Sequence, residues 1–276
     1  MVRMKDLSFS YGGKEILRNL DLEVRPGETV MITGPNGVGK STILRLLAGV
    51  LIPTSGSVDH GFPEGTDPRR KTAFLPDSLS IYSSMTPLEA AKFHGGIFGT
   101  EPSGLEIATS AGVDLNKKIS ELSVGQRVLV QLSIILSTDP EIILIDEVLH
   151  AVDPYLRCLL FRELIRVMEE QNPAVVMVNL NFTEIENMVD RVVFLGSGGI
   201  RLNQRVDDLK AGTRRVISEE VPEGLPVILS SSVLGKRHHI VYPFSGERTN
   251  HPGLDISGMD LTDIMTAFMG AEYDAG

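Results

Sequence analysis

A chain of 276 residues has room for one large α/β domain and a small appendage, but not for two full domains of that size. Its 42% apolar and 22% charged residues are ordinary for a globular protein and exclude the disordered, collagen-like and coiled-coil classes. The net charge of -10 argues against a protein that wraps nucleic acid, so no nucleic-acid partner is expected. No stretch is apolar for long enough to span a bilayer, and residues 1–7 lack the apolar core of a secretory signal, so we expect a cytoplasmic protein.

The first elements are predicted to be strands. The loose alternation of Val2–Tyr11 and the clear alternation of Leu20–Val24 predict two antiparallel strands that end at the Pro26–Gly27 turn. The apolar run Thr29–Thr33 predicts a buried strand, and the apolar spacing within Ser41–Gly49 predicts a helix closed by glycine. The chain therefore begins with an antiparallel β-subdomain and continues as strand, loop and helix.

The middle of the chain predicts helices around a further buried strand. A partly irregular helical insertion, with a helix beginning at Thr86–Pro87, is expected over about residues 80–136 and ends with a helix over Val124–Ser137. The Ile/Leu run Glu141–Ile145 is typical of a strand buried on both faces of a parallel sheet. Asp153–Pro154 predicts the start of a helix that ends near Asn172–Pro173, and its apolar pattern predicts that the single cysteine, Cys158, is a buried packing residue.

The last third changes character. Val175–Val178 and Val192–Leu195 predict two more buried strands, with a helical stretch between them over Thr183–Val189. Short runs at Leu225–Leu229 and His239–Tyr242 predict a small β-rich appendage, followed by a helix that Asp260 caps. The predicted fold class is α/β, with a mainly parallel sheet, the antiparallel β-subdomain, the helical insertion and this C-terminal appendage.

A phosphate-binding motif lies between the buried strand and the helix near residue 40. It matches G-x-x-x-x-G-K-[ST], and we call the segment the phosphate loop: Gly34, Pro35, Asn36, Gly37, Val38, Gly39, Lys40 and Ser41. Glycines let successive N–H groups point at phosphate oxygens, and the helix N-terminus adds its positive dipole end. Lys40 can reach the β- and γ-phosphates, Ser41 can bind Mg²⁺, and Thr42 can add a phosphate contact.

Two acids end the second buried strand. Asp146 is predicted to hold Mg²⁺, and Glu147 is the candidate general base that orients or deprotonates the attacking water. Such a pair alone is more often a helix cap or a solvated turn. Together with the phosphate loop, however, the pair predicts a P-loop nucleotidase that uses ATP and Mg²⁺ as cofactors.

The order of these motifs resembles the nucleotide-binding domain of ABC transporters from about Met4 to Leu202. Tyr11 stands where that family stacks an aromatic ring on adenine, and Leu122–Gln126, the signature segment, stands where it carries LSGGQ. The resemblance implies a head-to-tail dimer in which Ser123, Val124, Gly125 and Gln126 act in trans on the partner's ATP, with Asp153 in the D-loop at the interface.

Three positions depart from the family pattern. Val124 replaces the first glycine of the signature segment, and Asp77 stands where transport ATPases often have glutamine, from which it can still offer Mg²⁺ an oxygen. Leu180 occupies the place of the family's switch histidine and cannot donate a hydrogen bond to phosphate. Turnover is therefore expected to be slow unless Asn179 or Asn181 substitutes.

The resemblance implies a nucleotide-binding domain over residues 1–203 and an accessory or regulatory region over 204–276, similar to the tail of ABC-2-type exporter ATPases. The leading hypothesis is an ATPase subunit that forms a homodimer or heterodimer and drives a separate integral membrane permease, so that it lies on the cytoplasmic face of the membrane. One alternative is a catalytically weak regulatory ABC subunit that binds ATP with little hydrolysis. The other is a soluble ABC ATPase without a transport role.

Overall fold

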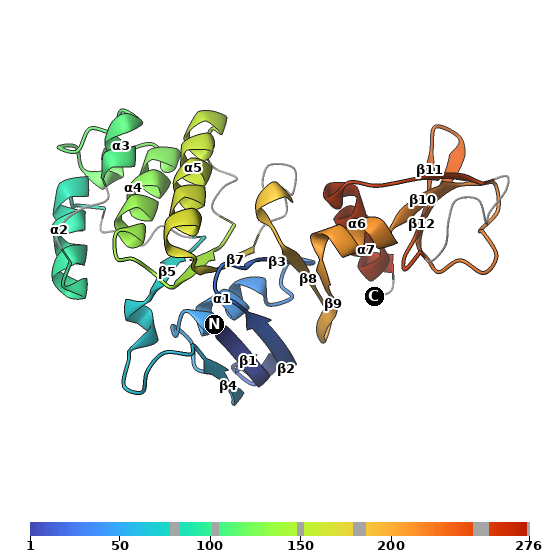
Figure 1. Ribbon diagram of the computed structural model, residues 1–276, viewed down its shortest axis with the longest axis horizontal. Coiled ribbons are helices and arrows are strands. Elements are labelled where there is room, and N and C mark those ends of the chain that lie inside the picture. Colours follow the sequence, from blue (N-terminus) through green and yellow to red (C-terminus); the bar gives the residue numbers. More distant parts are fainter. Residues whose placement is uncertain (78–82, 101–104, 148–151, 179–185, 245–253, 275–276) are drawn as a thin grey trace. The chain divides into compact units, whose positions relative to one another are not determined.

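The computed structural model describes residues 1–77, 83–100, 105–147, 152–178, 186–244 and 254–274 (Figure 1). The chain forms two compact units, which are described separately. The first unit consists of Met1–Val30 and Gly39–Asn179, and the second consists of Met31–Val38 and Leu180–Gly276. Among the described residues, no helix combines the length and the hydrophobicity that crossing a membrane requires.

An antiparallel sheet opens the first unit. Its strand order is β2-β1-β4, with β1 at Val2–Tyr11, β2 at Lys14–Val24 and β4 at Ser55–Asp59. Along β1 the buried residues are Val2, Met4, Leu7 and Phe9, and the remaining positions face outward or are half-buried. This sheet confirms the predicted antiparallel β-subdomain. An antiparallel sheet can bury one apolar face and expose the other to water, which explains the alternating burial along β1.

Parallel strands form the core of the first unit. β5 (Thr72–Leu75), β6 (Ile142–Ile145) and β7 (Ala174–Val178) pair in parallel, and every residue of β6 and β7 is buried. The six-stranded sheet to which they belong has the order β5-β6-β7-β3-β8-β9, with β3 at Thr29–Thr33. The continuous Ile, Leu and Val runs are thus those of strands covered on both faces, as predicted.

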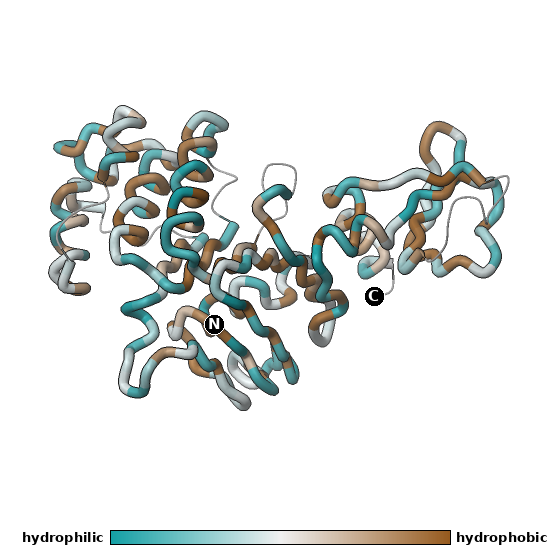
Figure 2. The backbone as a smooth tube through the Cα atoms, viewed as in Figure 1, coloured by the Kyte–Doolittle hydropathy of each residue, from teal (hydrophilic) through white to brown (hydrophobic). Residues whose placement is uncertain are grey.

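Five helices of the first unit accompany these strands: α1 (Lys40–Leu47), α2 (Pro87–Phe98), α3 (Glu106–Ser110), α4 (Val124–Leu136) and α5 (Pro154–Gln171). Single 3-10 turns lie at Pro68–Arg70 and Ile119–Glu121. Hydrophobic and hydrophilic bands alternate along α4 and α5 (Figure 2), which is the pattern of amphipathic helices. The predicted helix starts are confirmed, since Thr86 caps α2 and Asp153 caps α5.

The prediction that Cys158 is buried was wrong, because its side chain is exposed. The buried stripe of α5 consists of Leu156, Leu159, Leu160, Leu164 and Val167. Cys158 is two residues, about 200° of helical rotation, after Leu156, so it lies off this stripe. An apolar pattern around a residue does not place that residue on the apolar face.

The second unit contains the hairpin of β8 (Arg191–Gly196) and β9 (Gly199–Arg205), followed by α6 (Val206–Gly212) and the terminal helix α7 (Leu261–Asp274). Its own sheet has the order β11-β12-β10-β13, and all neighbours are antiparallel. The strands are β10 (Arg214–Ile217), β11 (Val227–Val233), β12 (Lys236–Val241) and β13 (Asp255–Ser257). Asp260 Oδ1 accepts a hydrogen bond from the N–H of Asp263 at 2.7 Å, so the predicted cap is confirmed.

The predicted β-rich appendage is confirmed, but the two strands expected at 225–229 and 239–242 are longer and their bounds are shifted, to Val227–Val233 and Lys236–Val241. β11 includes the serines at 230–232, which the sequence pattern treated as a loop. Leu234 and Gly235 have φ values of 50° and 79° and close a two-residue turn that carries the chain directly into β12. Of the predicted helical stretch Thr183–Val189, only a 3-10 turn at Glu186–Met188 falls within the described residues.

The terminal helix is fastened to the β8–β9 turn by Glu272. Its Oε1 accepts hydrogen bonds from the N–H of Ser197 at 2.6 Å and from Ser197 Oγ at 2.7 Å, which lower the pKa of the Glu272 carboxyl. Charged acceptors make stronger bonds than neutral ones, so we expect Glu272→Gln to reduce the free energy of unfolding by about 1 kcal/mol at neutral pH. A folded-state pKa below the unfolded one stabilises the protein above the unfolded pKa, and that gain is lost as pH falls through the folded pKa.

Urea unfolding of the two proteins at neutral and acidic pH tests this expectation. The difference between wild type and variant should be present at neutral pH and vanish in acid, where both side chains are uncharged. Equal stability at neutral pH would show that the terminal helix does not depend on this carboxylate.

Candidate functional site

The phosphate loop has the backbone that its glycines allow. Gly34, Gly37 and Gly39 have φ values of 144°, 80° and 112°, which L-residues other than glycine rarely adopt. Gly39 is the N-cap residue of α1, and no side chain caps the helix there. The N-terminal N–H groups of α1 are therefore not occupied by a capping side chain, as an anion-binding helix start requires.

Lys40 is the first residue of α1 and its side chain is only 6% exposed. Its Nζ lies 3.7 Å from Glu147 Oε1, close enough for an ion pair but too far for a hydrogen bond. Burial lowers the pKa of Lys40, while the charges of Glu147 and Asp146 act in the opposite direction. An anionic oxygen placed beside this ammonium would, like the two carboxylates, favour its charged form.

Ser41 and Asp146 form the oxygen-rich part of the site. Ser41 Oγ donates a hydrogen bond to Asp146 Oδ1 at 3.1 Å, and the N–H of Glu147 donates to the same oxygen at 3.2 Å. Asp146 Oδ2 is buried and lacks a hydrogen-bond partner among the described residues. Burial raises the pKa of Asp146, and the nearby charge of Asp77 adds to this effect, whereas the Ser41 hydrogen bond opposes it. A buried carboxylate oxygen beside a hydroxyl is a donor set that suits Mg²⁺.

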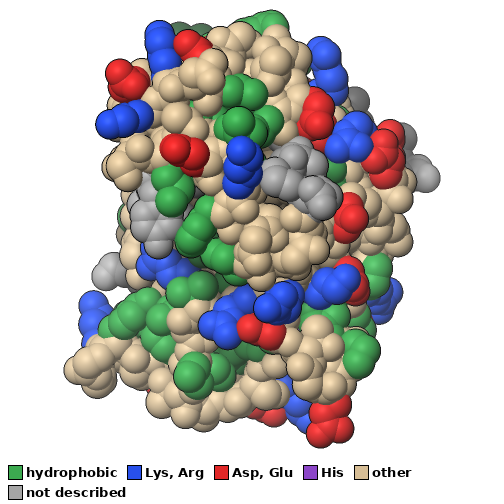
Figure 3. All heavy atoms as spheres, turned by 90° about the vertical axis from the view of Figure 1, so that its left-hand side faces the viewer, with side chains coloured by type: hydrophobic (Ala, Val, Ile, Leu, Met, Phe, Trp, Pro, Cys, Tyr) green, Lys and Arg blue, Asp and Glu red, His purple; other side chains and the backbone are tan. Residues whose placement is uncertain are grey.

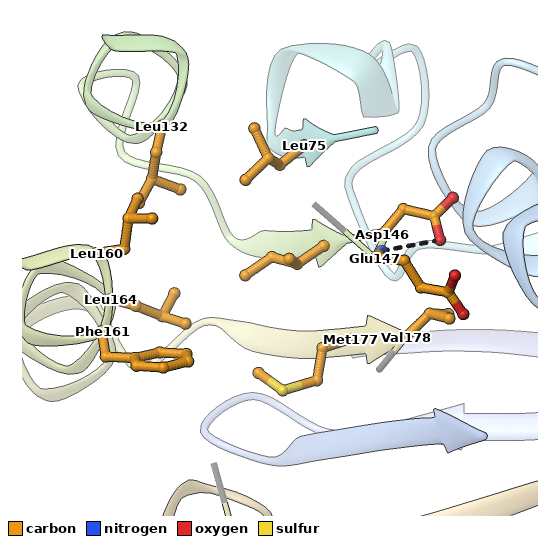
Figure 4. Close-up of a pocket in the computed structure, with 10 residues that line it drawn as sticks. Leu75, Leu132, Asp146, Glu147, Leu160, Phe161, Leu164, Met177 and Val178 are labelled. Carbon is orange, nitrogen blue, oxygen red and sulfur yellow. Dashed lines mark hydrogen bonds between the residues drawn. The ribbon is translucent and has the colours of Figure 1, made fainter. Parts of the chain in front are cut away.

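The packing of β6 holds both carboxylates in place. Asp146 and Glu147 directly follow the strand, and their carboxylates point away from the apolar side chains of Leu160, Phe161 and Leu164 (Figure 4). The cavity behind them measures about 20 Å³, room for one water at most. The carboxylates therefore stand on a nearly solid apolar layer, which limits their freedom to rotate.

Two other predicted residues have partners that the sequence did not reveal. Asp77 forms an ion pair with Arg45 of α1, with 3.4 Å between Oδ1 and Nη2. Tyr11, at the end of β1, is 45% exposed and packs edge-to-face on Phe9, with ring centroids 4.7 Å apart. Its exposed surface is available to a planar group, and the contact with Phe9 restricts its orientation.

The signature segment begins α4. Ser123 Oγ accepts a hydrogen bond from the N–H of Gln126 at 3.2 Å, and Gln126 Oε1 accepts one from the N–H of Ser123 at 3.1 Å. This capping box sets the direction in which the helix starts. Val124, which replaces a glycine of the family pattern, is 40% exposed.

Gly125 lies against the start of α5, a contact that the sequence analysis missed. A Cβ at this position would meet Leu156 Cδ1 at 2.9 Å, Val152 Cγ1 at 3.4 Å and Asp153 Oδ2 at 3.5 Å. Asp153 Oδ1 in turn accepts hydrogen bonds from the N–H groups of Tyr155 and Leu156, both at 3.1 Å. The start of α4 and Asp153, the N-cap residue of α5, thus pack on each other within one chain.

Arg157 also supports the start of α5, since its Nη2 donates a hydrogen bond to the Val152 carbonyl oxygen at 2.8 Å. Its position four residues after the N-cap residue, one helical turn along α5, is the sequence signal that points to it. The three candidates at the switch position, Asn179, Leu180 and Asn181, lie outside the described residues.

The loop geometry, the buried lysine and the paired carboxylates define a P-loop nucleotide-binding protein. Residues 17–150 match the family model described as ABC transporter. The chain is 31% identical over 207 residues to the lactose transport ATP-binding protein LacK of Rhizobium radiobacter, covering 71% of this chain and 57% of that relative. It is 26% identical over 211 residues to the lantibiotic transport ATP-binding protein SrtF of Streptococcus pyogenes, covering 75% of this chain and 92% of that one.

Among solved structures, the chain resembles the dimeric post-hydrolysis state of the ATP-binding cassette MJ0796 bound to ADP and Pi. The TM-score is 0.66 at 27% identity, and the alignment covers 74% of this chain and 98% of the cassette. The chain therefore carries the ATP-binding domain of ABC transporters. It spans 57% of the length of the lactose transport relative, so that protein's full activity does not transfer with the domain.

Proposed function

We propose that the chain is the ATP-binding subunit of an ABC transporter, an ATPase that drives a separate membrane subunit. The observation that carries the proposal is the assembly of Lys40, Ser41, Asp146 and Glu147, in which a buried cation and two carboxylates meet at the start of α1 and the end of β6. Phosphoryl transfer depends mainly on positioning and on stabilising charge, and these are the groups it needs.

In the proposed reaction, Lys40 binds the β- and γ-phosphates and gives up part of its contact with Glu147. Ser41 and Asp146, with Asp77 as a further candidate, would hold Mg²⁺, and the bound ion would neutralise phosphate charge. Glu147 then orients the attacking water and accepts its proton. Tyr11 stacks on the adenine ring, and Gly34–Val38, Gly39 and Thr42 surround the phosphates.

The proposed working unit is a head-to-tail dimer, as a homodimer or with another ABC subunit. The solved cassette that this chain resembles is described as dimeric and bound to ADP and Pi. In the dimer, Ser123, Val124, Gly125 and Gln126 would face the partner's ATP, where the positive end of the α4 helix dipole favours anions. Asp153 would lie at the interface between the two chains.

A membrane permease is the proposed partner, which would hold the chain at the cytoplasmic face of the membrane. Phe93 and Ile97, four residues apart on α2, are 46% and 51% exposed and give the helical insertion a small apolar surface. Figure 3 shows exposed hydrophobic side chains among charged ones on the side of the molecule that carries this helix. We also propose that the chain belongs to the ABC-2-type exporter ATPases and that residues 204–276 form an accessory or regulatory region.

Steady-state ATP hydrolysis tests the proposal, with Lys40→Ala as the blank and with measurements in the absence and presence of the membrane proteins that copurify with the chain. We expect Mg²⁺-dependent turnover that Lys40→Ala abolishes, because the buried ammonium is lost from the phosphate site. Tight ATP binding without turnover under both conditions would instead favour the catalytically weak regulatory subunit. Leu180 at the switch position is the sequence feature that motivates this alternative. Turnover with no copurifying membrane protein would favour the soluble alternative.

A further inference from the structure

The sheet of the C-terminal appendage is filled on one face only. One face carries a core cluster that consists of Val216, Val241, Phe244 and Ile256. The other face is only partly covered by α7, and a cavity of about 360 Å³ lies between them, within the second unit. Figure 1 shows α7 and the strands β10, β11 and β12 that belong to this part.

Strand register explains which side chains face the cavity. Leu229, Ser231 and Val233 alternate along β11, and His238 and Ile240 alternate along the neighbouring β12. The residues between them face the opposite side, where Ser230 Oγ lies 2.8 Å from His239 Nδ1. One wall of the cavity is thus formed by side chains on the same face of β11 and β12.

Helix α7 contacts the sheet at two points beside the cavity. Gly270 lies close to Leu229, so that a Cβ on the glycine would be 3.2 Å from Leu229 Cδ2. Asp263, two turns earlier, accepts a hydrogen bond from Arg215 of β10, with 2.5 Å between Oδ2 and Nη2. Between these contacts the helix turns only the small side chains of Thr266 and Ala267 toward the cavity. They are too short to fill the space.

The cavity has the size and lining of a ligand site. The cavity opens to solvent beside the exposed residues Ser231 and Val233, and its volume falls in the range of about 300–1,000 Å³ that is usual for small-molecule pockets. The apolar part consists of Leu229, Val233, Ile240, Met259 and Ala267, and the polar part includes Ser231, His238 and Thr266. An apolar wall with a few hydrogen-bonding groups fits a molecule that is itself amphipathic.

The charged groups at the cavity have a small excess of positive charge. Asp263 is the only carboxylate in the described wall, and its charge is balanced by its ion pair with Arg215. His238 lies in the wall, and Lys236, two residues earlier on β12, is on the same face of the sheet. We propose that this cavity binds a small amphipathic anion, with its apolar body against Ile240 and Met259 and its acidic group toward His238 and Lys236 of β12.

Fluorescence titration of the full chain with anilinonaphthalenesulfonate tests the proposal. The dye has an aromatic body and one sulfonate, and excess ATP and Mg²⁺ keep it out of the nucleotide site. We expect saturable binding of one dye per chain. Uncharged phenylnaphthylamine, which lacks the sulfonate, should bind about tenfold more weakly because it cannot make charge-assisted hydrogen bonds.

Two variants on neighbouring residues of β11 locate the site. Ser231→Trp places a large ring in the cavity, whereas Ser232→Trp places it on the opposite face of the same exposed strand segment. We expect Ser231→Trp to weaken dye binding about tenfold or more and Ser232→Trp to leave it within about twofold. No saturable binding, or equal effects of the two substitutions, would overturn the site, and equal affinity for both dyes would overturn its preference for anions.

Discussion

Glu147→Gln should reduce steady-state ATP turnover at least about 100-fold while ATP binding is retained, because general-base assistance contributes 10²–10⁴-fold to such reactions. Glutamine keeps the shape of the side chain and its place at the end of β6, but it cannot accept the proton of the attacking water. The chemical step is lost while closure around ATP remains, so the variant should accumulate as an ATP-bound dimer. Phosphate release and size-exclusion chromatography with and without ATP measure the two effects.

Glu141→Gln is the matched control for this substitution. Glu141 immediately precedes β6, at the opposite end of the strand, where it pairs with Lys71 at 3.4 Å and is 57% exposed. An exposed pair of this kind contributes little, so turnover should stay within about twofold of wild type. If Glu147→Gln hydrolysed ATP as fast as this control, another group would have to be the base.

Gly34→Ala should destabilise the protein by about 3 kcal/mol or more, because it combines backbone strain with a collision against main chain. Gly34 has a φ of 144°, and a Cβ built on it would overlap the carbonyl oxygen of Leu195. That oxygen belongs to β8, so it cannot move aside as the end of a flexible side chain would. Urea unfolding in the absence of nucleotide measures the loss.

Gly37→Ala separates the two causes. Gly37 also has a positive φ, 80°, but a Cβ there would meet no atom within 4 Å. Only the conformational penalty applies, and the free energy of unfolding should fall by about 1–2 kcal/mol. Equal losses for the two variants would mean that the Leu195 contact is unimportant and that strain alone accounts for both.

Local signals predicted most of the first unit. Thr29–Thr33 is a strand with the predicted bounds, and the strands near residues 142–145 and 174–178 follow from uninterrupted Ile, Leu and Val runs. The caps at Thr86, Ser123 and Asp153 fix where helices begin, and such motifs depend only on residues within one turn. The meeting of Lys40 with Glu147 was predictable because the end of a buried strand and a phosphate loop adjoin in this fold class.

The remaining features depend on contacts that no local pattern encodes. The Arg45–Asp77 ion pair joins residues that are 32 positions apart, and only the packing of the fold brings these two side chains together. The serines of β11 give no strand signal in the sequence. They are part of a strand because their backbone pairs with β12, a contact that no local pattern encodes. Gly125 was predicted only as part of the signature segment, and the sequence did not reveal that α5 approaches it too closely to leave room for a side chain.

The packing of Gly125 on Val152, Asp153 and Leu156 has a consequence for how the two ATP molecules of the proposed dimer influence each other. The signature segment of each chain would touch one nucleotide, and the adjoining D-loop would lie beside the other. A displacement at either place must be transmitted to the other, since there is no space between them to absorb it. Occupancy of the two sites would then be linked, and ATP turnover should rise with ATP concentration more steeply than a simple hyperbola.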